Sequence, residues 1–288
     1  MTTPPAAAPA HATDQGRGAP ALVFVHGFSC SRTDWAPQVS ALSATHRCIA
    51  IDLPGHGDTP ACAEASIAAL GASVNATLDA LGARDVVLIG HSMGCRVVSE
   101  ACDRAPARVR GLVYVDGSFI EGDPAAIVAA TEAKIDALGI EPFLAGLYRE
   151  FHVDATPQAV REAIDAHLGH IDRAFARRLV VDMVRWDSTR ARAVLRTIGR
   201  PVLAIQSTLF DTDLNRVPVR AGVLTPFSRA VLDCAPGARI ETIACGHFTM
   251  LEAPEQTNAL IGAFVDGLGS RPATFDMHPM RPQLPDDR

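Results

Sequence analysis

The sequence predicts an α/β fold: a doubly wound, mostly parallel sheet with helices on both faces and an all-helical segment inserted into it. Short, nearly continuous apolar runs alternate with longer stretches of helical periodicity, as in parallel sheets. Most of these runs are rich in Val, Leu and Ile, as expected for strands that helices cover on both faces. One long interval, from about Phe119 to Gly199, contains no strand-like run.

The expected strands follow one another along the chain with helices between them. They are Ala21–Val25, Arg47–Asp52, Asp85–Gly90, Gly111–Asp116, Pro201–Gln206 and Arg239–Ala244. Helices are expected at Ser66–Leu81 and Met93–Arg104. The interval without strands is expected to form helices at Pro124–Leu138, Glu141–Phe151, Pro157–Leu168 and Ile171–Trp186, with a shorter piece to Thr197.

These elements predict a domain organisation. Residues 20–118 and 200–269 form the α/β core, and residues 119–199 form a helical cap over the ends of the strands. Residues 1–19 are rich in Ala and Pro, and residues 270–288 are rich in Pro with mixed charge. Both of these terminal segments are expected to be disordered.

Composition excludes several classes of function. The 288 residues carry a net charge of −6, which disfavours a nucleic-acid-binding surface. No apolar run approaches the roughly 18 residues of a membrane span, and the N-terminus lacks the features of a secretory signal. The seven cysteines are odd in number and form no C-x-x-C pair, which disfavours disulfides and zinc. We expect a cytoplasmic protein.

The most informative segment is Gly90-His91-Ser92-Met93-Gly94, which lies between a predicted buried strand and a predicted helix. It matches G-x-S-x-G in the strand–turn–helix context that makes this motif credible. Side chains at the two glycine positions would collide with neighbouring backbone in so sharp a turn. The turn would hold Ser92 in a strained conformation and present its hydroxyl above the sheet.

With this motif the sequence resembles the α/β-hydrolase superfamily in its cap-bearing branch. Three further motifs agree: His26-Gly27-Phe28 after the first strand, Asp52-Leu-Pro-Gly55-His56-Gly57 after the second, and Cys245-Gly246-His247-Phe248 after the last. The resemblance covers about residues 20–268. The antiparallel strands that open the family's sheet are not visible in residues 1–19.

The resemblance implies a role for each motif. Ser92 would be the nucleophile and His247 the base that removes its proton. The backbone N–H groups of Phe28 and Met93 would form an oxyanion hole. By the same resemblance, His26, His56 and His91 would have structural roles. The resemblance implies no metal or organic cofactor.

The acidic partner of His247 stays open between two strand ends. Most family members carry it after the penultimate strand, where this chain has Asp211 and Asp213, although Asp211 is out of register by one residue. Asp116 ends the strand after the nucleophile helix, a position that some lactone hydrolases use. We favour Asp116, and we expect Asp52 to brace its own glycine turn.

The predicted activity is hydrolysis of a carboxylic ester or lactone of small to medium, mostly apolar character. Phe28, Phe119 and Trp186 are expected to contact this substrate. A C–C bond hydrolase acting on a vinylogous diketone would use the same residues, and a non-catalytic ligand-binding protein on the same fold is the other alternative. The only partner expected is the small-molecule substrate, without nucleic acid or membrane, for a monomer or homodimer.

Overall fold

The computed structural model describes residues 9–167, 169–211 and 216–269. A seven-stranded sheet runs through it in the order β1-β3-β2-β4-β5-β6-β9. Strand β1 pairs with β3 in the antiparallel direction, and the other neighbouring strands are parallel. The expected doubly wound, mostly parallel sheet is therefore confirmed.

Six of the seven strands of this sheet agree closely with the expected runs, and β1 is additional. Their bounds are β1 Ala12–Gln15, β2 Ala21–Val25, β3 Cys48–Ile51, β4 Val86–His91, β5 Val109–Val115, β6 Val202–Gln206 and β9 Arg239–Thr242. A separate antiparallel hairpin follows β6 and consists of β7 Thr208–Phe210 and β8 Arg216–Pro218.

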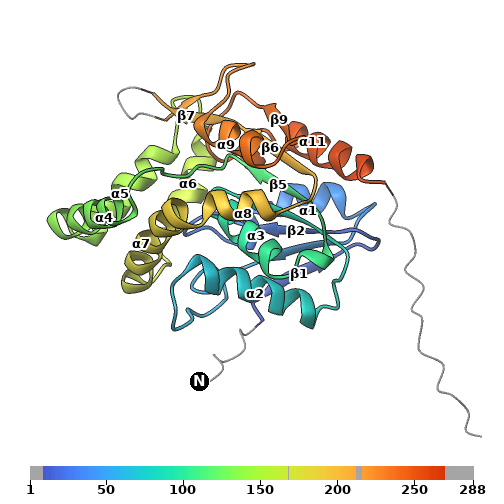
Figure 1. Cartoon of the computed structure of the whole chain (residues 1–288), viewed down its shortest axis with the longest axis horizontal. Coiled ribbons are helices and arrows are strands. Elements are labelled where there is room, and N and C mark those ends of the chain that lie inside the picture. Colours follow the sequence, from blue (N-terminus) through green and yellow to red (C-terminus); the bar gives the residue numbers. More distant parts are fainter. Residues whose placement is uncertain (1–8, 168, 212–215, 270–288) are drawn as a thin grey trace, which may run out of the picture.

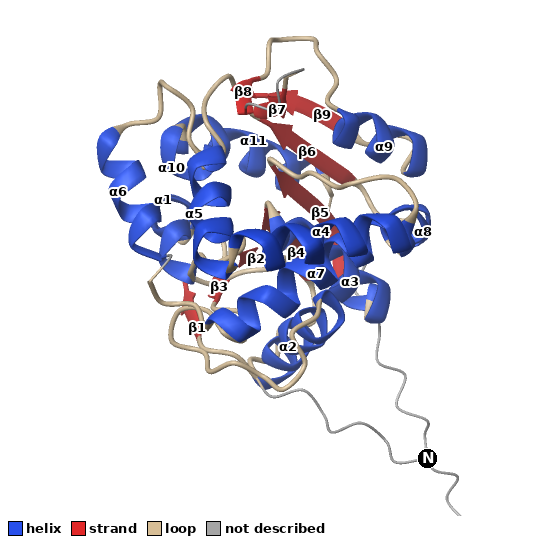
Figure 2. Cartoon of the chain, turned by 90° about the vertical axis from the view of Figure 1, so that its left-hand side faces the viewer, coloured by secondary structure: helices blue, strands red, loops and turns tan. Residues whose placement is uncertain are grey.

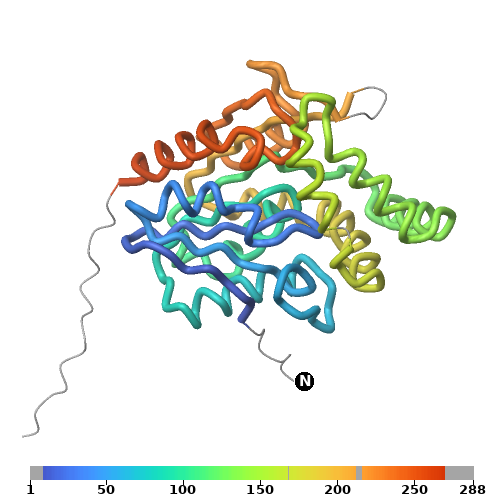
Figure 3. The backbone as a smooth tube through the Cα atoms, turned by 180° about the vertical axis from the view of Figure 1, so that it is seen from behind, coloured from blue at the N-terminus to red at the C-terminus, as the bar shows by residue number. Residues whose placement is uncertain are grey.

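Helices cover both faces of the sheet because neighbouring strand residues point to opposite faces. Val23 and Val25 pack on the face with α2 Ile67–Ala80 and α3 Met93–Arg104. Leu22 and Phe24 pack on the other face, with α1 Ala36–Leu42 and α11 Pro254–Gly267. Figure 3 shows this second face from behind, with the blue α1 beside the red α11.

Shorter helices complete the two layers. They are the 3-10 turns η1 Arg32–Trp35 and η2 Pro106–Arg108, and the helices α9 Pro226–Cys234 and α10 Thr249–Glu252. None of the helices in the described part of the chain combines the length and apolarity needed to cross a membrane.

Between β5 and β6 the described chain is helical. The helices are α4 Pro124–Leu138, α5 Ile140–Phe151, α6 Gln158–His167, α7 Arg173–Thr189 and α8 Ala191–Thr197. Helices α4, α5 and α7 gather at one end of the sheet (Figure 1) and lie in front of its strands in the view from that side (Figure 2). Asp123 and Asp172 cap the first turns of α4 and α7 with their carboxylates.

The expectation of disorder through residue 19 is wrong where the structure describes this segment. Residues 12–15 form β1, which pairs Ala12 with Ile51 and Gln15 with Cys48. Arg47, which precedes β3, forms an ion pair with Asp14 of β1 at 2.7 Å and so adds a side-chain contact between the two strands. A short, half-polar edge strand lacks the apolar run by which the other strands were identified. Residues 1–8 and 270–288 lie outside the described part.

Candidate active site

Ser92 lies at the sharp turn between β4 and α3. Its backbone has φ 52° and ψ −115°, a conformation that is costly for a residue other than glycine. The N–H of Ser92 donates to the carbonyl oxygen of Val115 at 3.0 Å, so the turn is held against the end of β5. Ser92 is half-buried, and it lines a cavity at the carboxyl end of the sheet.

Two glycines make this turn possible. A Cβ atom at Gly90 would overlap the carbonyl group of Gly94, and one at Gly94 would overlap the carbonyl oxygen of Val25. Both obstacles are backbone atoms, which cannot rotate away as a side chain could. The predicted reason for both glycines is therefore confirmed.

His247 brings its imidazole to Ser92 from the loop after β9. Its Nε2 lies 3.0 Å from the Ser92 Oγ, and its Nδ1 lies 2.6 Å from the Asp116 Oδ2. The Asp116 carboxylate can only accept, so Nδ1 carries the proton and Nε2 keeps its lone pair for the serine hydroxyl. The ring is buried, with Phe151 and His91 beside it.

Asp116 occupies a buried anion site at the end of β5, where its own backbone has φ 45°. The N–H groups of Ser207 and Thr208 each donate to its Oδ1 at 2.9 Å. The Thr208 hydroxyl donates to its Oδ2 at 2.5 Å, beside the bond from His247. These hydrogen bonds from Ser207, Thr208 and His247 fix the orientation of the Asp116 carboxylate.

The competing acids lie elsewhere or are not described. Asp211 ends the β7 side of the hairpin and lines a different hollow, together with Asp154 and Arg149. Asp213 lies outside the described residues. Asp52 contacts the backbone of its own loop, where it accepts from the Asp58 N–H at 2.9 Å.

Burial and charge set the protonation of the pair. Burial first, and then the positive charge of Arg216, lower the pKa of His247 well below its ordinary 6.5. Burial by itself would raise the pKa of Asp116, but its bond to His247 and the charges of His247 and Arg216 lower that pKa to about 2. At neutral pH the imidazole is therefore neutral and the carboxylate ionised.

Sequence reasoning assigned no functional role to Arg216, Thr208 or Ser207. Arg216 lies on β8 and donates from Nη1 to the Thr208 Oγ1 at 2.7 Å. The same Nη1 is 3.6 Å from the Asp116 Oδ2. No motif surrounds these residues, because the hairpin that brings β8 back to β7 is what places them beside Asp116.

The predicted backbone donors lie at the two loops beside Ser92. Phe28 follows β2, Met93 is the first residue of α3, and both are buried. Neither N–H has a hydrogen-bond acceptor among the residues that the structure describes. Both groups are therefore available to an oxygen atom bound at Ser92.

A cavity of about 420 Å³ opens over Ser92 between the sheet and the helices α4, α5 and α7. Its wall is mostly apolar and rich in phenylalanine, with contributions from Phe28, Phe119, Phe143, Phe151, Phe210 and Phe227. A charged pair in the wall is mutually satisfied, because Arg96 donates two bonds of 2.7 Å to Asp187. Phe28 and Phe119 thus line the same cavity as Ser92.

Trp186, which was expected to contact the substrate, does not line this cavity. The α7 residues that line the cavity are Val180, Met183, Val184 and Asp187, which share one helix face. Trp186 lies off that face and packs against α3. There its Nε1–H donates to the buried Glu100 at 3.0 Å, a contact that joins α7 to the core.

Three other motif histidines have structural contacts. His91 donates from Nε2 to the carbonyl oxygen of His247 at 2.9 Å and so anchors the histidine loop. His26 accepts from the Leu53 N–H at 3.0 Å, and His56 lies 3.0 Å from the Pro54 carbonyl oxygen. The bond of His26 ties the loop after β2 to the loop after β3, and the bond of His56 lies within the loop after β3.

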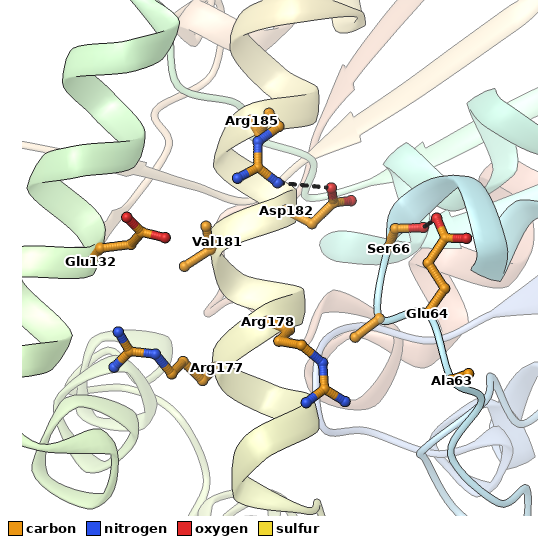
Figure 4. Close-up of a pocket in the computed structure, with 10 residues that line it drawn as sticks. Ala63, Glu64, Ser66, Glu132, Arg177, Arg178, Val181, Asp182 and Arg185 are labelled. Atoms are coloured by element: carbon orange, nitrogen blue, oxygen red, sulfur yellow. Dashed lines mark hydrogen bonds and ion pairs between the residues drawn. The ribbon is translucent and has the colours of Figure 1, made fainter.

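A second hollow, of about 450 Å³, lies away from Ser92 between α7 and the loop before α2 (Figure 4). Its wall carries both signs of charge, including Arg178, Arg185, Asp182 and Glu64. Arg185 pairs with Asp182 at 3.5 Å, and Ser66 donates a hydrogen bond to Glu64.

Within the described residues, no group of three or more His, Cys, Asp or Glu side chains could hold a metal ion.

Known proteins resemble this chain along most of its length. The dihydrolipoyllysine-residue acetyltransferase component of an acetoin cleaving system from Pseudomonas putida is 29% identical over 264 residues, which are 87% of this chain and 64% of that protein. The chain spans less than two thirds of the length of curated relatives such as this one.

Solved structures share the fold. A hydrolase from Pseudomonas aeruginosa PA01 superposes with a TM-score of 0.72 at 25% identity, over 88% of this chain and 93% of that one. Est816, described as an N-acyl homoserine lactone degrading enzyme, gives a TM-score of 0.72 at 24% identity, over 88% and 96%. Residues 22–260 match the model of the alpha/beta hydrolase family, and the chain belongs to that family.

Proposed function

We propose that the protein is a serine hydrolase that cleaves a carboxylic ester or lactone through an acyl-enzyme on Ser92. The observation that carries the proposal is the continuous chain of contacts from Ser92 through His247 to Asp116, with distances of 3.0 and 2.6 Å. A serine hydroxyl becomes a useful nucleophile only when a base takes its proton during attack. His247 is the base, and Asp116 holds it in the required tautomer.

The first half of the reaction acylates the enzyme. The Ser92 Oγ attacks the substrate carbonyl carbon while its proton passes to the His247 Nε2. Negative charge develops on the carbonyl oxygen, which the N–H groups of Phe28 and Met93 stabilise. Removing one such donor costs about 3 kcal/mol in well-studied hydrolases. The alcohol then leaves with the proton from His247.

The second half releases the acid. A water molecule gives a proton to the His247 Nε2 and attacks the acyl-enzyme, and Ser92 regains its proton when the carboxylic acid leaves. For a lactone both products remain one molecule, because the alcohol and the acyl group are joined. Imidazolium forms twice in this cycle, and each time it faces the ionised Asp116.

The cavity supports a small to medium, largely apolar substrate. Its volume of about 420 Å³ suits an acyl chain or an aromatic acyl group, and its phenylalanine rings offer no hydrogen bonds. Since Arg96 and Asp187 neutralise each other, that part of the wall offers no free charge to an ionic substrate. Helices α4, α5 and α7 act as the cap that shields this space from water.

The test is hydrolysis of chromogenic p-nitrophenyl esters of increasing acyl length and of simple lactones. We expect a stoichiometric burst of p-nitrophenol followed by slower turnover, because the acyl-enzyme accumulates. Ser92→Ala should lose both phases, while Ser118→Ala, a neighbouring serine in the cavity wall, should keep them. Turnover in Ser92→Ala would overturn the proposal. Cleavage of a vinylogous diketone without ester hydrolysis would favour the C–C bond hydrolase instead.

A further inference from the structure

We infer that Arg216 is a positioning residue for the catalytic pair: its guanidinium directs the hydroxyl proton of Thr208 onto Asp116 and keeps the His247 imidazole uncharged. The inference rests on the proposed function of Ser92, His247 and Asp116. It adds a residue from β8, an element outside every motif that identifies the site.

Arg216 is fixed by contacts on several sides. Its Nη1 donates to the Thr208 Oγ1 at 2.7 Å, and its Nε donates to the Glu150 carbonyl oxygen of α5 at 2.9 Å. The guanidinium also lies over the Phe210 ring, with 4.6 Å to the ring centroid. Its side chain is only 8% exposed, so the charge acts with little screening by water.

The contact with Thr208 determines where a proton points. A threonine hydroxyl has one proton and two lone pairs, and a guanidinium has only donors. Thr208 must therefore accept from Arg216, so its own proton is free for Asp116, whose Oδ2 lies at 2.5 Å. In this way Arg216 adds an oriented hydrogen bond to the carboxylate that orients His247.

The charge of Arg216 acts directly on the imidazole. Its Nη1 is 3.3 Å from the His247 Nδ1, and both nitrogens carry protons, so this contact is a repulsive one for imidazolium. Asp116 and Arg216 therefore push the proton affinity of His247 in opposite directions. The neighbouring His91 lowers that affinity further, and Glu150 faces Arg216 with the opposite charge.

This balance has a functional consequence. A base works only while it is unprotonated, so a cation beside His247 extends its working range toward acid. An opposite or like charge at such a distance moves a pKa by about one to three units. Loss of the Arg216 charge should therefore raise the pH below which the enzyme loses activity.

The experiment compares Arg216→Gln, which removes the charge but keeps an N–H donor, with Arg216→Lys, which keeps the charge. Two readouts are followed against pH: kcat/KM for a p-nitrophenyl ester, and the NMR signals of the His247 ring, assigned with His247→Gln. We expect the acidic midpoint of Arg216→Gln to rise by about one to three pH units in both readouts. Arg216→Lys should stay closer to the wild type than to Arg216→Gln.

A further variant separates the parts of the inference. Thr208→Val removes the oriented hydroxyl and should lower kcat by about tenfold while the acidic midpoint stays near that of the wild type. Should Arg216→Gln fail to fold, Arg216→Met takes its place, because it removes the same charge while an unbranched side chain still fills the buried site. Its acidic midpoint should rise as in Arg216→Gln.

An unchanged midpoint in Arg216→Gln, or in Arg216→Met where the former does not fold, would overturn the inference. So would a midpoint in Arg216→Lys that rises as far as in Arg216→Gln, since charge would then not be the cause. The NMR titration needs no turnover. An NMR shift without any ester hydrolysis would uphold the action of Arg216 on His247 and refute the proposed function alone.

Discussion

Replacement of Asp116 by asparagine should disable the base without disturbing the fold. The N–H groups of Ser207 and Thr208 both donate to one oxygen of Asp116, at 2.9 Å each. In Asp116→Asn that position must hold the amide oxygen, because an NH₂ group there would face two donors. The amide NH₂ is thus forced toward His247.

The size of the effect follows from this orientation. An NH₂ donor facing the His247 Nδ1 requires an unprotonated Nδ1, so the proton moves to Nε2, the nitrogen 3.0 Å from the Ser92 Oγ. That tautomer cannot accept the serine proton. The same exchange in a serine protease lowers kcat by about 10⁴-fold, equivalent to about 5.5 kcal/mol of transition-state stabilisation. We expect a loss of that order here.

The assay is kcat for p-nitrophenyl ester hydrolysis at neutral pH, with thermal unfolding as the check on the fold. Asp211→Asn is the matched control, since it makes the same change at the competing acid and should retain nearly wild-type turnover. Retention of more than about a tenth of the activity by Asp116→Asn, or an equal loss in Asp211→Asn, would refute the reasoning.

Three further predictions concern stability. Gly90→Ala should lower the free energy of unfolding by at least about 3 kcal/mol, because its Cβ overlaps the backbone of Gly94. Gly262→Ala in α11, where nothing lies within 4 Å of the new Cβ, should raise that free energy by up to about 1 kcal/mol. Urea unfolding measures both changes, and a loss below about 1 kcal/mol in Gly90→Ala would contradict the close packing of the turn. Asp187→Ala should lower the free energy of unfolding by about 3 to 5 kcal/mol, because it leaves the buried Arg96 without its partner. A loss below about 1 kcal/mol in urea unfolding would show that the ion pair contributes little to stability. The protein should lose stability as the pH falls below 6.5, because burial lowers the pKa of His26 to about 3 and of His56 to about 4, so the unfolded chain binds more protons than the folded one. Each of these two histidines should contribute a slope of about 1.4 kcal/mol per pH unit between 6.5 and about 4, and a melting temperature constant over that interval would contradict their neutral burial.

Much of the fold could be predicted because its signals are local. The buried strands can be recognised as apolar runs, and the turn at Ser92 requires glycines at positions 90 and 94, which the sequence has. Strand β1 was missed because Ala12–Gln15 is short and half-polar and gains its stability by pairing with β3, an event distant in the sequence. Edge strands of this kind leave little trace in hydrophobic periodicity.

The site was harder to predict where it depends on packing between distant elements. Asp116 and Asp211 follow neighbouring strands, and the sequence alone could not show which carboxylate reaches His247. Arg216 could not be found at all, since only the β7–β8 hairpin brings it to Asp116. Trp186 could not be placed from the sequence, because an aromatic residue on a helix can face either the cavity or the core. Its hydrogen bond to Glu100 holds it against the core.

The central claim is that the Ser92 hydroxyl is activated by His247, and a fluorophosphonate tests it most directly. We expect peptide mass spectrometry to find one adduct per chain, on Ser92, formed at a rate that falls steeply in His247→Gln and is absent in Ser92→Ala. A crystal structure of the adduct should place the phosphoryl oxygen between the N–H groups of Phe28 and Met93. Labelling of another residue, or an equal rate in His247→Gln, would contradict the account.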